Sequence, residues 1–262
     1  MDLISKSIGI VFSGGGFKGI AHAGALQYLL EQRIQPSYIA GTSAGAIVGA
    51  LYAFGKTPIQ ILEFFKSIYF FEWKHFTFVK AGIIDSESFK SDFFEIFGNT
   101  SIGDLKIPTY ITATDLVKGK LKIFNSKTKL VDAVLASSSF PGIFSPYEIN
   151  EKLYSDGGIL NHFPTDILQG KCDYLIGIYV SPIENIEGIE NLKSIKSVTS
   201  RAFDLMYANN NYQKFKLCNW VIEPKELANF SAFETNKNNM DAIFEIGYNE
   251  AKKTFKKLDG NY

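Results

Sequence analysis

The sequence predicts an α/β domain built on a mainly parallel sheet. Two stretches, residues 8–12 (IGIVF) and 174–180 (YLIGIYV), are continuous apolar runs, which are typical of parallel strands buried on both faces. Strand patterns alternate with helix patterns along the rest of the chain, without repeats or a clear linker. At 262 residues the chain is long enough to bury a substantial core. We therefore expect one domain over residues 1–262.

The composition narrows the classes of function. Lys+Arg and Asp+Glu both number 27, so no net charge attracts nucleic acid or an anionic membrane. No apolar run approaches the roughly 18–20 residues that span a bilayer, and the N-terminus has the pattern of a first strand and not of a signal peptide. Cys172 and Cys218 make no metal cluster, and they favour two reduced, buried thiols over a single disulfide bridge. We expect a cytoplasmic protein that binds no nucleic acid.

A glycine-rich loop follows the first strand. Residues 13–19 (SGGGFKG) precede a helix expected over 20–32. The backbone N–H groups of such a loop at a helix N-terminus bind anions. The spacing G-x-G-x-x-G fits a dinucleotide site, but that site needs an acid at the end of the second strand, and the nearest one, Glu31, lies within the helix. The other hypothesis is an oxyanion hole made by the glycine amides.

A second turn carries a serine between two glycines. Residues 38–54 (YIAGTSAGAIVGALYAF) predict a strand, a tight turn and a buried helix, with Ser43 at the apex. Gly41 and Gly45 let neighbouring backbone come close, and the helix dipole favours negative charge at the turn. The motif is typical of a nucleophile, although small residues at a helix start also serve close packing alone. In a parallel βαβ unit this turn and the glycine loop share one sheet edge, which favours the catalytic interpretation.

The middle of the chain combines predicted helices with an aromatic stretch. Thr57 is expected to cap the N-terminus of a helix, with Pro58 in its first turn. Aromatic residues crowd positions 64–78, where they fill either the core, a cap over an acyl-chain pocket or a surface that meets lipid. A run of lysines around residue 120 favours a solvated strand face, with anionic head groups as the alternative contact. The expected elements here are helices over 57–70, 86–97 and 130–138 and strands over 109–115 and 120–125.

The C-terminal half brings a carboxylate to the end of a strand. Residues 153–158 (LYSDGG) deliver Asp156 into a turn made by Gly157 and Gly158. Turn aspartates are often structural, but carboxylates at strand ends of an α/β sheet gather at functional sites. The remaining expected elements are a helix from Pro164, a strand over 174–180, a helix over about 192–213, a strand over 218–224 and a helix over about 240–257.

A serine nucleophile needs a base, and the chain has three histidines. His22 lies inside the first helix, where packing explains it, and His75 has no evident partner. A triad of Ser43 with His162, with Asp115 as the acid, is formally allowed by the chain order.

The alternative to the triad is a direct Ser43–Asp156 dyad. An aspartate is a weak base, with a reference pKa of about 3.9. It can serve when the hydroxyl is held against it and the oxyanion is strongly stabilised, because oxyanion donors often contribute the largest single effect.

Taken together, these motifs resemble the patatin-like phospholipase family. The matching stretches are SGGGFKGIAHAG (13–24), GTSAG (41–45), ASSSFPGIF (136–144) and YSDGGILNHFP (154–164). The resemblance implies that Ser43 is the nucleophile and Asp156 the base, without a histidine. By the same resemblance the oxyanion donors are Gly14, Gly15 and Gly16, and the supporting motif residues are Lys18, Gly19, Gly41, Gly45, Gly157 and Gly158. Ser13 departs from the family pattern, where Asp is frequent.

The combined prediction is a serine acyl-hydrolase of lipid esters, of phospholipase A or lysophospholipase type, on a three-layer α/β/α domain. No metal or cofactor is implied. The expected partners are a lipid ester substrate and, transiently, a membrane surface, and the oligomeric state is left open. Three alternatives remain: a non-catalytic lipid- or partner-binding module on the same fold, a nucleotide-binding oxidoreductase, and an acyltransferase that passes the acyl group to an alcohol or thiol.

Overall fold

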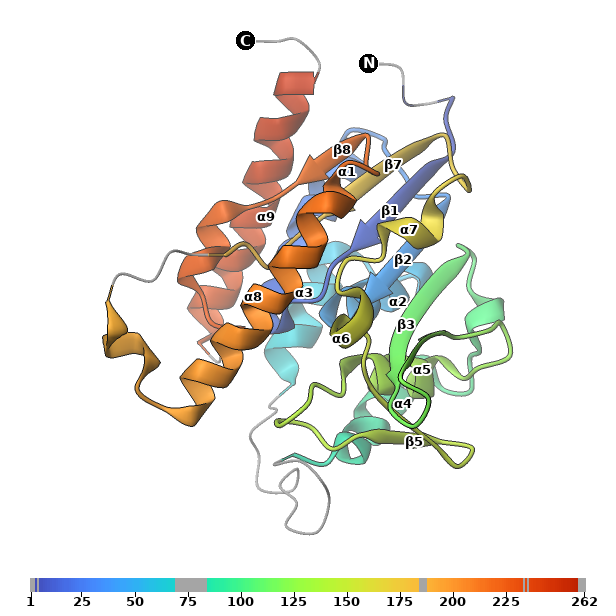
Figure 1. Ribbon diagram of the computed structural model, residues 1–262. Helices are drawn as coiled ribbons and strands as arrows, with labels where there is room; N and C mark the ends of the chain where they lie inside the picture. Colours follow the sequence, from blue (N-terminus) through green and yellow to red (C-terminus); the bar gives the residue numbers. More distant parts are fainter. Residues whose placement is uncertain are drawn as a thin grey trace.

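One mixed sheet of eight strands lies at the centre of the described part of the chain (Figure 1). The computed structural model describes residues 3, 5–68, 84–183, 188–232, 234 and 236–258. The strand order is β5-β6-β3-β2-β1-β7-β8, and β4 pairs with β3. The strands are β1 (Ile8–Phe12), β2 (Tyr38–Thr42), β3 (Thr109–Asp115), β4 (Lys120–Ile123), β5 (Tyr147–Ile149), β6 (Lys152–Asp156), β7 (Tyr174–Ile178) and β8 (Trp220–Ile222).

The central part of the sheet is parallel, as predicted. The pairs β3–β2, β2–β1, β1–β7 and β7–β8 are parallel, whereas β4, β5 and β6 add antiparallel pairs at one end. Every residue of β1 and β7 is buried. This explains their continuous apolar runs, because both faces of an interior parallel strand are covered.

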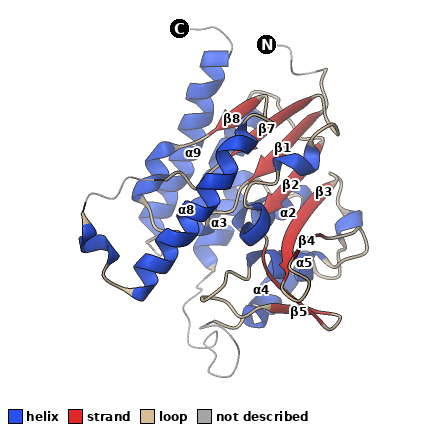
Figure 2. Cartoon of the chain, in the orientation of Figure 1, coloured by secondary structure: helices blue, strands red, loops and turns tan. Residues whose placement is uncertain are grey.

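Helices cover both faces of the sheet, which confirms the three-layer arrangement (Figure 2). Along β1, Ile10 and Phe12 point into the larger core, and Val11 points into the smaller core on the opposite face with Phe163 and Leu168. The helices on the first face are α1 (Ile20–Glu31), α2 (Ala44–Phe54), α3 (Pro58–Ser67), α4 (Lys90–Phe97), α5 (Leu130–Ser138) and α9 (Lys237–Leu258). Those on the second face are α6 (Gly158–Asn161), α7 (Thr165–Leu168) and α8 (Ile195–Phe215).

The tips of β2 and β6 meet end to end along one edge of β3. Thr112 of β3 pairs with Thr42 of β2 on one edge and with Ile123 of β4 on the other. The next residue, Ala113, pairs with Asp156 of β6. β4 pairs with the other edge of β3 at these residues. β6 therefore pairs with the same edge of β3 as β2 does, directly beyond the end of β2. The chain leaving β2 and the chain leaving β6 therefore emerge at the same place.

Most predicted elements are present, with shifted ends. The predicted strands and helices over 8–12, 109–115 and 130–138 agree with β1, β3 and α5 at both ends. The helix expected over 57–70 ends at Ser67; its start is fixed by Thr57, whose side chain accepts from the Gln60 N–H in a capping box. The helix expected over 86–97 begins as a 3₁₀ turn, Ser86–Phe89.

Two short elements, β5 and α6, were not predicted. The turn expected after Asp156 instead opens directly into the single-turn helix α6. Of the aromatic stretch over 64–78, Phe65 is buried and Phe64 packs against the core. Residues 69–78, His75 among them, lie outside the described residues.

Two further expectations concern the thiols and the membrane. Cys172 and Cys218 are free cysteines, as predicted, but both are only half-buried and not fully buried. Among the helices that the structure describes, none is both long enough and apolar enough to cross a bilayer.

Candidate active site

Ser43 occupies a strained turn between β2 and α2. Its φ of 55° and ψ of −127° are a conformation that non-glycine residues rarely adopt. A Cβ at Gly41 would overlap the Gly45 carbonyl oxygen, and a Cβ at Gly45 would overlap the carbonyl oxygens of Phe12 and Ser13. Only glycine therefore permits the close approach of backbone on either side of the serine, as the motif predicted.

A hydroxyl on the helix behind the turn holds the Ser43 backbone in place. The Ser43 N–H donates to Ser137 Oγ of α5 at 2.9 Å. Ser137 belongs to the motif at 136–144, but no local pattern indicates this role, since the side chain bonds a backbone atom far along the chain. Gly19 belongs to the same tight packing, because a Cβ there would lie 2.6 Å from Ala44 Cβ.

Asp156 is buried at the tip of β6, 2% exposed. Its Oδ1 accepts from the Gly158 N–H at 2.7 Å. Burial raises the pKa of its carboxyl to about 6, against lowering contributions from the Ser43 side chain and the Gly158 N–H. Gly157 must be glycine, because a Cβ there would lie 2.6 Å from the backbone oxygen of Thr112.

Ser43 and Asp156 are neighbours, brought together by the meeting of β2 and β6. The Ser43 side chain lies near enough to lower the pKa of the Asp156 carboxyl. Among the described residues, however, Asp156 Oδ2 has no partner in standard hydrogen-bond geometry. The two side chains are thus in proximity, without a hydrogen bond of standard geometry between them.

The glycine loop lies against the same site, and its three amides differ. The Gly14 N–H donates to the His162 carbonyl oxygen at 3.0 Å, so this amide, expected to bind the oxyanion, is already engaged. Gly15 and Gly16 line the cavity beside Ser43. Within the described part of the chain, no hydrogen bond is made by the N–H of either residue.

Two buried histidines support this loop through contacts that lead to its carbonyl groups. His22 Nε2 lies 2.8 Å from the Ser13 carbonyl oxygen. His162 Nε2 lies 3.0 Å from Ser181 Oγ, which donates to the Gly14 carbonyl oxygen at 3.0 Å. Since the single Ser181 hydroxyl proton is used on Gly14, Nε2 of His162 carries the ring proton.

Both imidazoles are withdrawn from solvent. Burial lowers the pKa of both imidazoles to about 3, so both are neutral at pH 7. The His162 ring contacts Ser181, Tyr207 and Tyr179. These contacts explain His162 as a support of the glycine loop.

An apolar cavity of about 1230 Å³, its open mouth included, extends from Ser43. Its floor is made by side chains from α2, α3, α4, α5 and the segments beside them. The apolar lining includes Ile47, Phe65, Phe89, Phe93, Leu135 and Phe144. A concave, largely apolar pocket with a few polar groups at one end is the usual form of a small-molecule site. Phe65 is thus a member of the aromatic stretch that faces the pocket.

Helix α8 closes the other side of the cavity with Phe203, Asp204 and Tyr207. Burial raises the pKa of the Asp204 carboxyl, and the charges of Lys18 and Arg201 oppose that rise. Lys18, predicted as a motif residue, therefore lies at the cavity, near α8.

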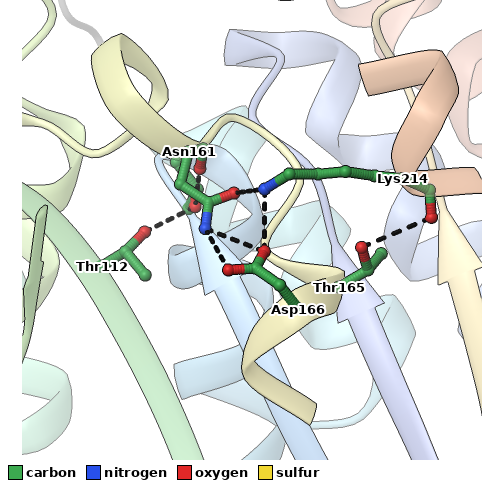
Figure 3. A network of polar contacts seen from close by, with 6 residues as sticks. Thr112, Asn161, Thr165, Asp166 and Lys214 are labelled. Carbon is green, nitrogen blue, oxygen red and sulfur yellow. Dashed lines mark hydrogen bonds and ion pairs between the residues drawn. The ribbon is translucent and has the colours of Figure 1, made fainter. Parts of the chain in front are cut away.

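A polar network fixes the end of α8 to the strand that carries Ser43 (Figure 3). Lys214 donates to Asn161 Oδ1 and, at 2.7 Å, to Asp166 Oδ1. The Asn161 side chain donates to both oxygens of Asp166, and its backbone oxygen accepts from Thr42 Oγ1 at 2.9 Å. Thr42 Oγ1 also lies 2.6 Å from Thr112 Oγ1. Thr42 and Asn161 lie within the motifs at 41–45 and 154–164, whereas Asp166 and Lys214 lie outside every motif, so no local spacing indicates the network.

Comparison with protein families identifies the chain. A family model described as patatin-like phospholipase matches residues 10–168. The chain belongs to the patatin-like phospholipase family. The match contains the glycine loop, Ser43, Asp156 and His162, and it ends before α8.

Curated relatives of this patatin-like chain match over similar ranges. An uncharacterized NTE family protein of Mycobacterium bovis is 32% identical over 169 residues, which span 63% of this chain and 46% of the relative. Lysophospholipase NTE1 of Coccidioides immitis is 31% identical over 166 residues, 61% of this chain and 10% of that protein. The patatin-like chain therefore spans less than half of the length of these relatives.

Solved structures share the fold of this patatin-like chain at low identity. VipD from Legionella pneumophila superposes with a TM-score of 0.63 and 14% identity, covering 96% of this chain and 67% of VipD. The type III effector ExoU gives a TM-score of 0.51 and 15% identity, covering 96% of this chain and 53% of ExoU. These similarities confirm the fold.

Proposed function

We propose that the protein is a serine acyl-hydrolase of lipid esters that uses a Ser43–Asp156 dyad. The observation that carries the proposal is a serine at a strained turn, beside a buried carboxylate whose pKa is raised to about 6, at the end of an apolar cavity. A base with a pKa near the working pH is suited to proton transfer. The lysophospholipase name of relatives supports a lipid ester as the substrate.

The reaction then has two stages. Asp156 takes the Ser43 proton as Oγ attacks the ester carbonyl carbon, and it gives that proton to the leaving alcohol. The oxyanion accepts from the free N–H groups of Gly15 and Gly16, while Gly14, bonded to His162, holds the loop in shape. In the second stage a water replaces the alcohol, and Asp156 takes the water's proton. The apolar lining holds the acyl chain.

An acyltransferase and a binding module are the competing functions. An acyltransferase shares the first stage and differs only in the acceptor that resolves the acyl-enzyme. A binding module keeps the cavity but has no need of a strained serine, a conformation that costs roughly 1–3 kcal/mol. The strain at Ser43 favours catalysis.

Covalent labelling of Ser43 tests the proposal. We expect the protein to react with a fluorophosphonate probe and to hydrolyse p-nitrophenyl butyrate and lysophosphatidylcholine. Ser43→Ala and Ser43→Gly should each lose labelling and at least about 10³-fold in kcat. The glycine variant suits the positive φ, so it keeps the test valid should the alanine variant misfold.

The matched control is Ser91→Ala, since Ser91 is an exposed serine on α4. It should retain both labelling and turnover. Turnover that survives in a folded Ser43→Gly protein would exclude Ser43 as the nucleophile. Accumulation of an acylated alcohol in place of free fatty acid would assign an acyltransferase.

A further inference from the structure

A polar group on α8, at the cavity, is unexplained by the dyad. Tyr207 of α8 lines the cavity together with Ser43 and Asp156, and only 8% of its surface is exposed. Within the described part of the chain its hydroxyl is buried without a hydrogen-bond partner. A buried hydroxyl without a partner is destabilising, so its presence in a cavity calls for a ligand that completes it.

Aromatic packing holds the Tyr207 ring in one orientation. The ring stacks on the His162 imidazole, with centroids 4.2 Å apart and planes 10° apart. Phe203, one turn earlier on α8, packs against it at 6.1 Å. The tyrosine is therefore held by the same histidine that supports the glycine loop, and its hydroxyl cannot easily rotate toward solvent.

The phenol lies beside the catalytic carboxylate. A Cβ placed on Gly158 would lie 2.9 Å from Asp156 Oδ1, 3.0 Å from His162 Nδ1 and 3.6 Å from Tyr207 Cζ, the atom that bears the hydroxyl. A side chain at position 158 would crowd these three groups, which explains why the residue is glycine. Burial, followed by the charges of Asp156 and Asp204, raises the pKa of the Tyr207 hydroxyl, so it remains a hydrogen-bond donor throughout the physiological range.

Two buried, unsatisfied groups of opposite character therefore belong to residues that line the same cavity as Ser43. Asp156 Oδ2 is an acceptor without a partner, and the Tyr207 hydroxyl is a donor without a partner. A water molecule can donate to the first and accept from the second, and polar sites with such complementary partners are where ordered water binds.

We propose that Tyr207 is a further catalytic residue, whose hydroxyl holds, together with Asp156 Oδ2, the water that hydrolyses the acyl-enzyme. The inference rests on the proposed acyl-hydrolase function. Asp156 takes one proton of the water while the water oxygen forms a bond to the acyl carbon. The bond from that carbon to Ser43 Oγ then breaks, and the proton passes from Asp156 to Ser43 Oγ. Tyr207 keeps its proton throughout and orients the attacking oxygen.

The variant Tyr207→Phe separates this role from a structural one. With p-nitrophenyl butyrate the leaving group departs without protonation, so acylation should stay nearly unchanged while deacylation slows. We expect kcat to fall roughly 10–100-fold and a rapid burst approaching one nitrophenolate per enzyme. The rate of fluorophosphonate labelling, which needs no water, should stay within about twofold of the native rate. Hydroxylamine, a nucleophile stronger than water, should restore turnover.

The outcomes distinguish failure of this inference from failure of the proposed function. Native protein that the probe does not label contradicts the acyl-hydrolase itself. Native protein that is labelled, with a Tyr207→Phe variant of equal kcat and no added burst, overturns the role of Tyr207. A parallel loss of labelling and turnover also overturns it, because that pattern indicates structural support. The control is Tyr28→Phe, at an equally buried tyrosine of α1 outside the cavity, which should match the native kinetics.

Discussion

At the scale of single residues, the site depends on what burial does to Asp156. A carboxylate in water is too weak a base for a serine hydroxyl, and its reference pKa of about 3.9 made the dyad hard to argue from sequence alone. Withdrawal from solvent raises the pKa of this carboxyl to about 6. The same withdrawal lowers the pKa of His162 to about 3. Because of burial, Asp156 has a higher pKa than His162 and is the stronger base of the two, which reverses the usual order of aspartate and histidine.

The raised pKa of Asp156 predicts how the reaction rate falls at acid pH. Asp156 must be ionised to accept a proton, so activity should be present above pH 6 and lost as the pH falls through that value. We expect kcat/KM for p-nitrophenyl butyrate to fall about tenfold for each pH unit below about 6. The measurement is a profile between pH 5 and 8, over the range where circular dichroism shows the native fold.

The pH at which the rate falls also decides between dyad and triad. If His162 were the base, its lowered pKa would move the fall toward pH 3 and leave activity level down to pH 5. Replacement of His162 by alanine distinguishes dyad from triad less clearly than the pH profile does, because His162 also contacts Gly14 and Tyr207. The carbonyl, ring nitrogen and ring face of this residue each make a separate contact.

The sequence motifs predicted Ser43 and Asp156, and other site residues escaped prediction for physical reasons. A strained turn and a glycine pair require particular residue types at fixed spacing, which leaves a recognisable pattern. The Gly14 amide is engaged because α6 places the His162 carbonyl beside it, and that position depends on tertiary structure. Ser137 and Tyr207 act across long separations in the chain, where no local spacing exists to detect.

At the scale of elements, α1 and α9 touch through two glycines. A Cβ at Gly24 would overlap the Phe244 carbonyl oxygen, and a Cβ at Gly247 would overlap the Ala21 carbonyl oxygen. Each glycine thus faces the backbone of the opposite helix. Around this contact Tyr28 packs edge-on against Tyr248, with ring centroids 5.4 Å apart. The two helices cross as closely as their backbones allow.

This crossing predicts the effect of a single methyl group. Gly247→Ala should destabilise the protein by about 1–3 kcal/mol, because the added carbon forces packed backbones apart. The measurement is the midpoint of urea unfolding. Asn249→Ala, at an exposed position two residues along the same helix, should leave the midpoint unchanged or slightly raised. An equal midpoint for both variants would show that the crossing is looser than described here.

Local chemistry decided which elements were predictable. The capping box at Thr57 and the left-handed Gly55 that ends α2 are sequence-local signals, and both helix ends follow from them. By contrast, β5 has three residues and α6 a single turn, too short for a periodic pattern. Their existence depends on pairing with β6 and on the turn after Asp156.

At the scale of the whole molecule, α8 presents different surfaces to the cavity and to solvent. Phe203 and Tyr207 line the cavity, whereas Val198, Leu205 and Met206 are 51%, 49% and 58% exposed. Exposed apolar side chains on a helix that borders an apolar cavity are suited to a lipid surface. We propose that this face of α8 is where the expected transient contact with a membrane occurs.

Negative charge on this face should lower activity on lipids in a membrane and leave activity on dissolved esters unchanged. The double variant Leu205→Glu, Met206→Glu should lower binding to phosphatidylcholine vesicles, and hydrolysis of lipid within them, by roughly tenfold or more. Hydrolysis of dissolved p-nitrophenyl butyrate should stay unchanged. Val117→Glu, in the exposed turn between β3 and β4, is the matched control. Equal losses on both substrates would indicate damage to the active site and contradict the membrane contact.

The end-to-end meeting of β2 and β6 also bears on how the protein folds. Ser43 and Asp156 come from distant parts of the chain, and they meet only when β2 and β6 have both paired with β3. Pairings between distant segments are the slow steps of folding, because loop closure must precede them. Helices form long before such a sheet is complete. If the proposed dyad operates, esterase activity should therefore recover later than helical structure during refolding.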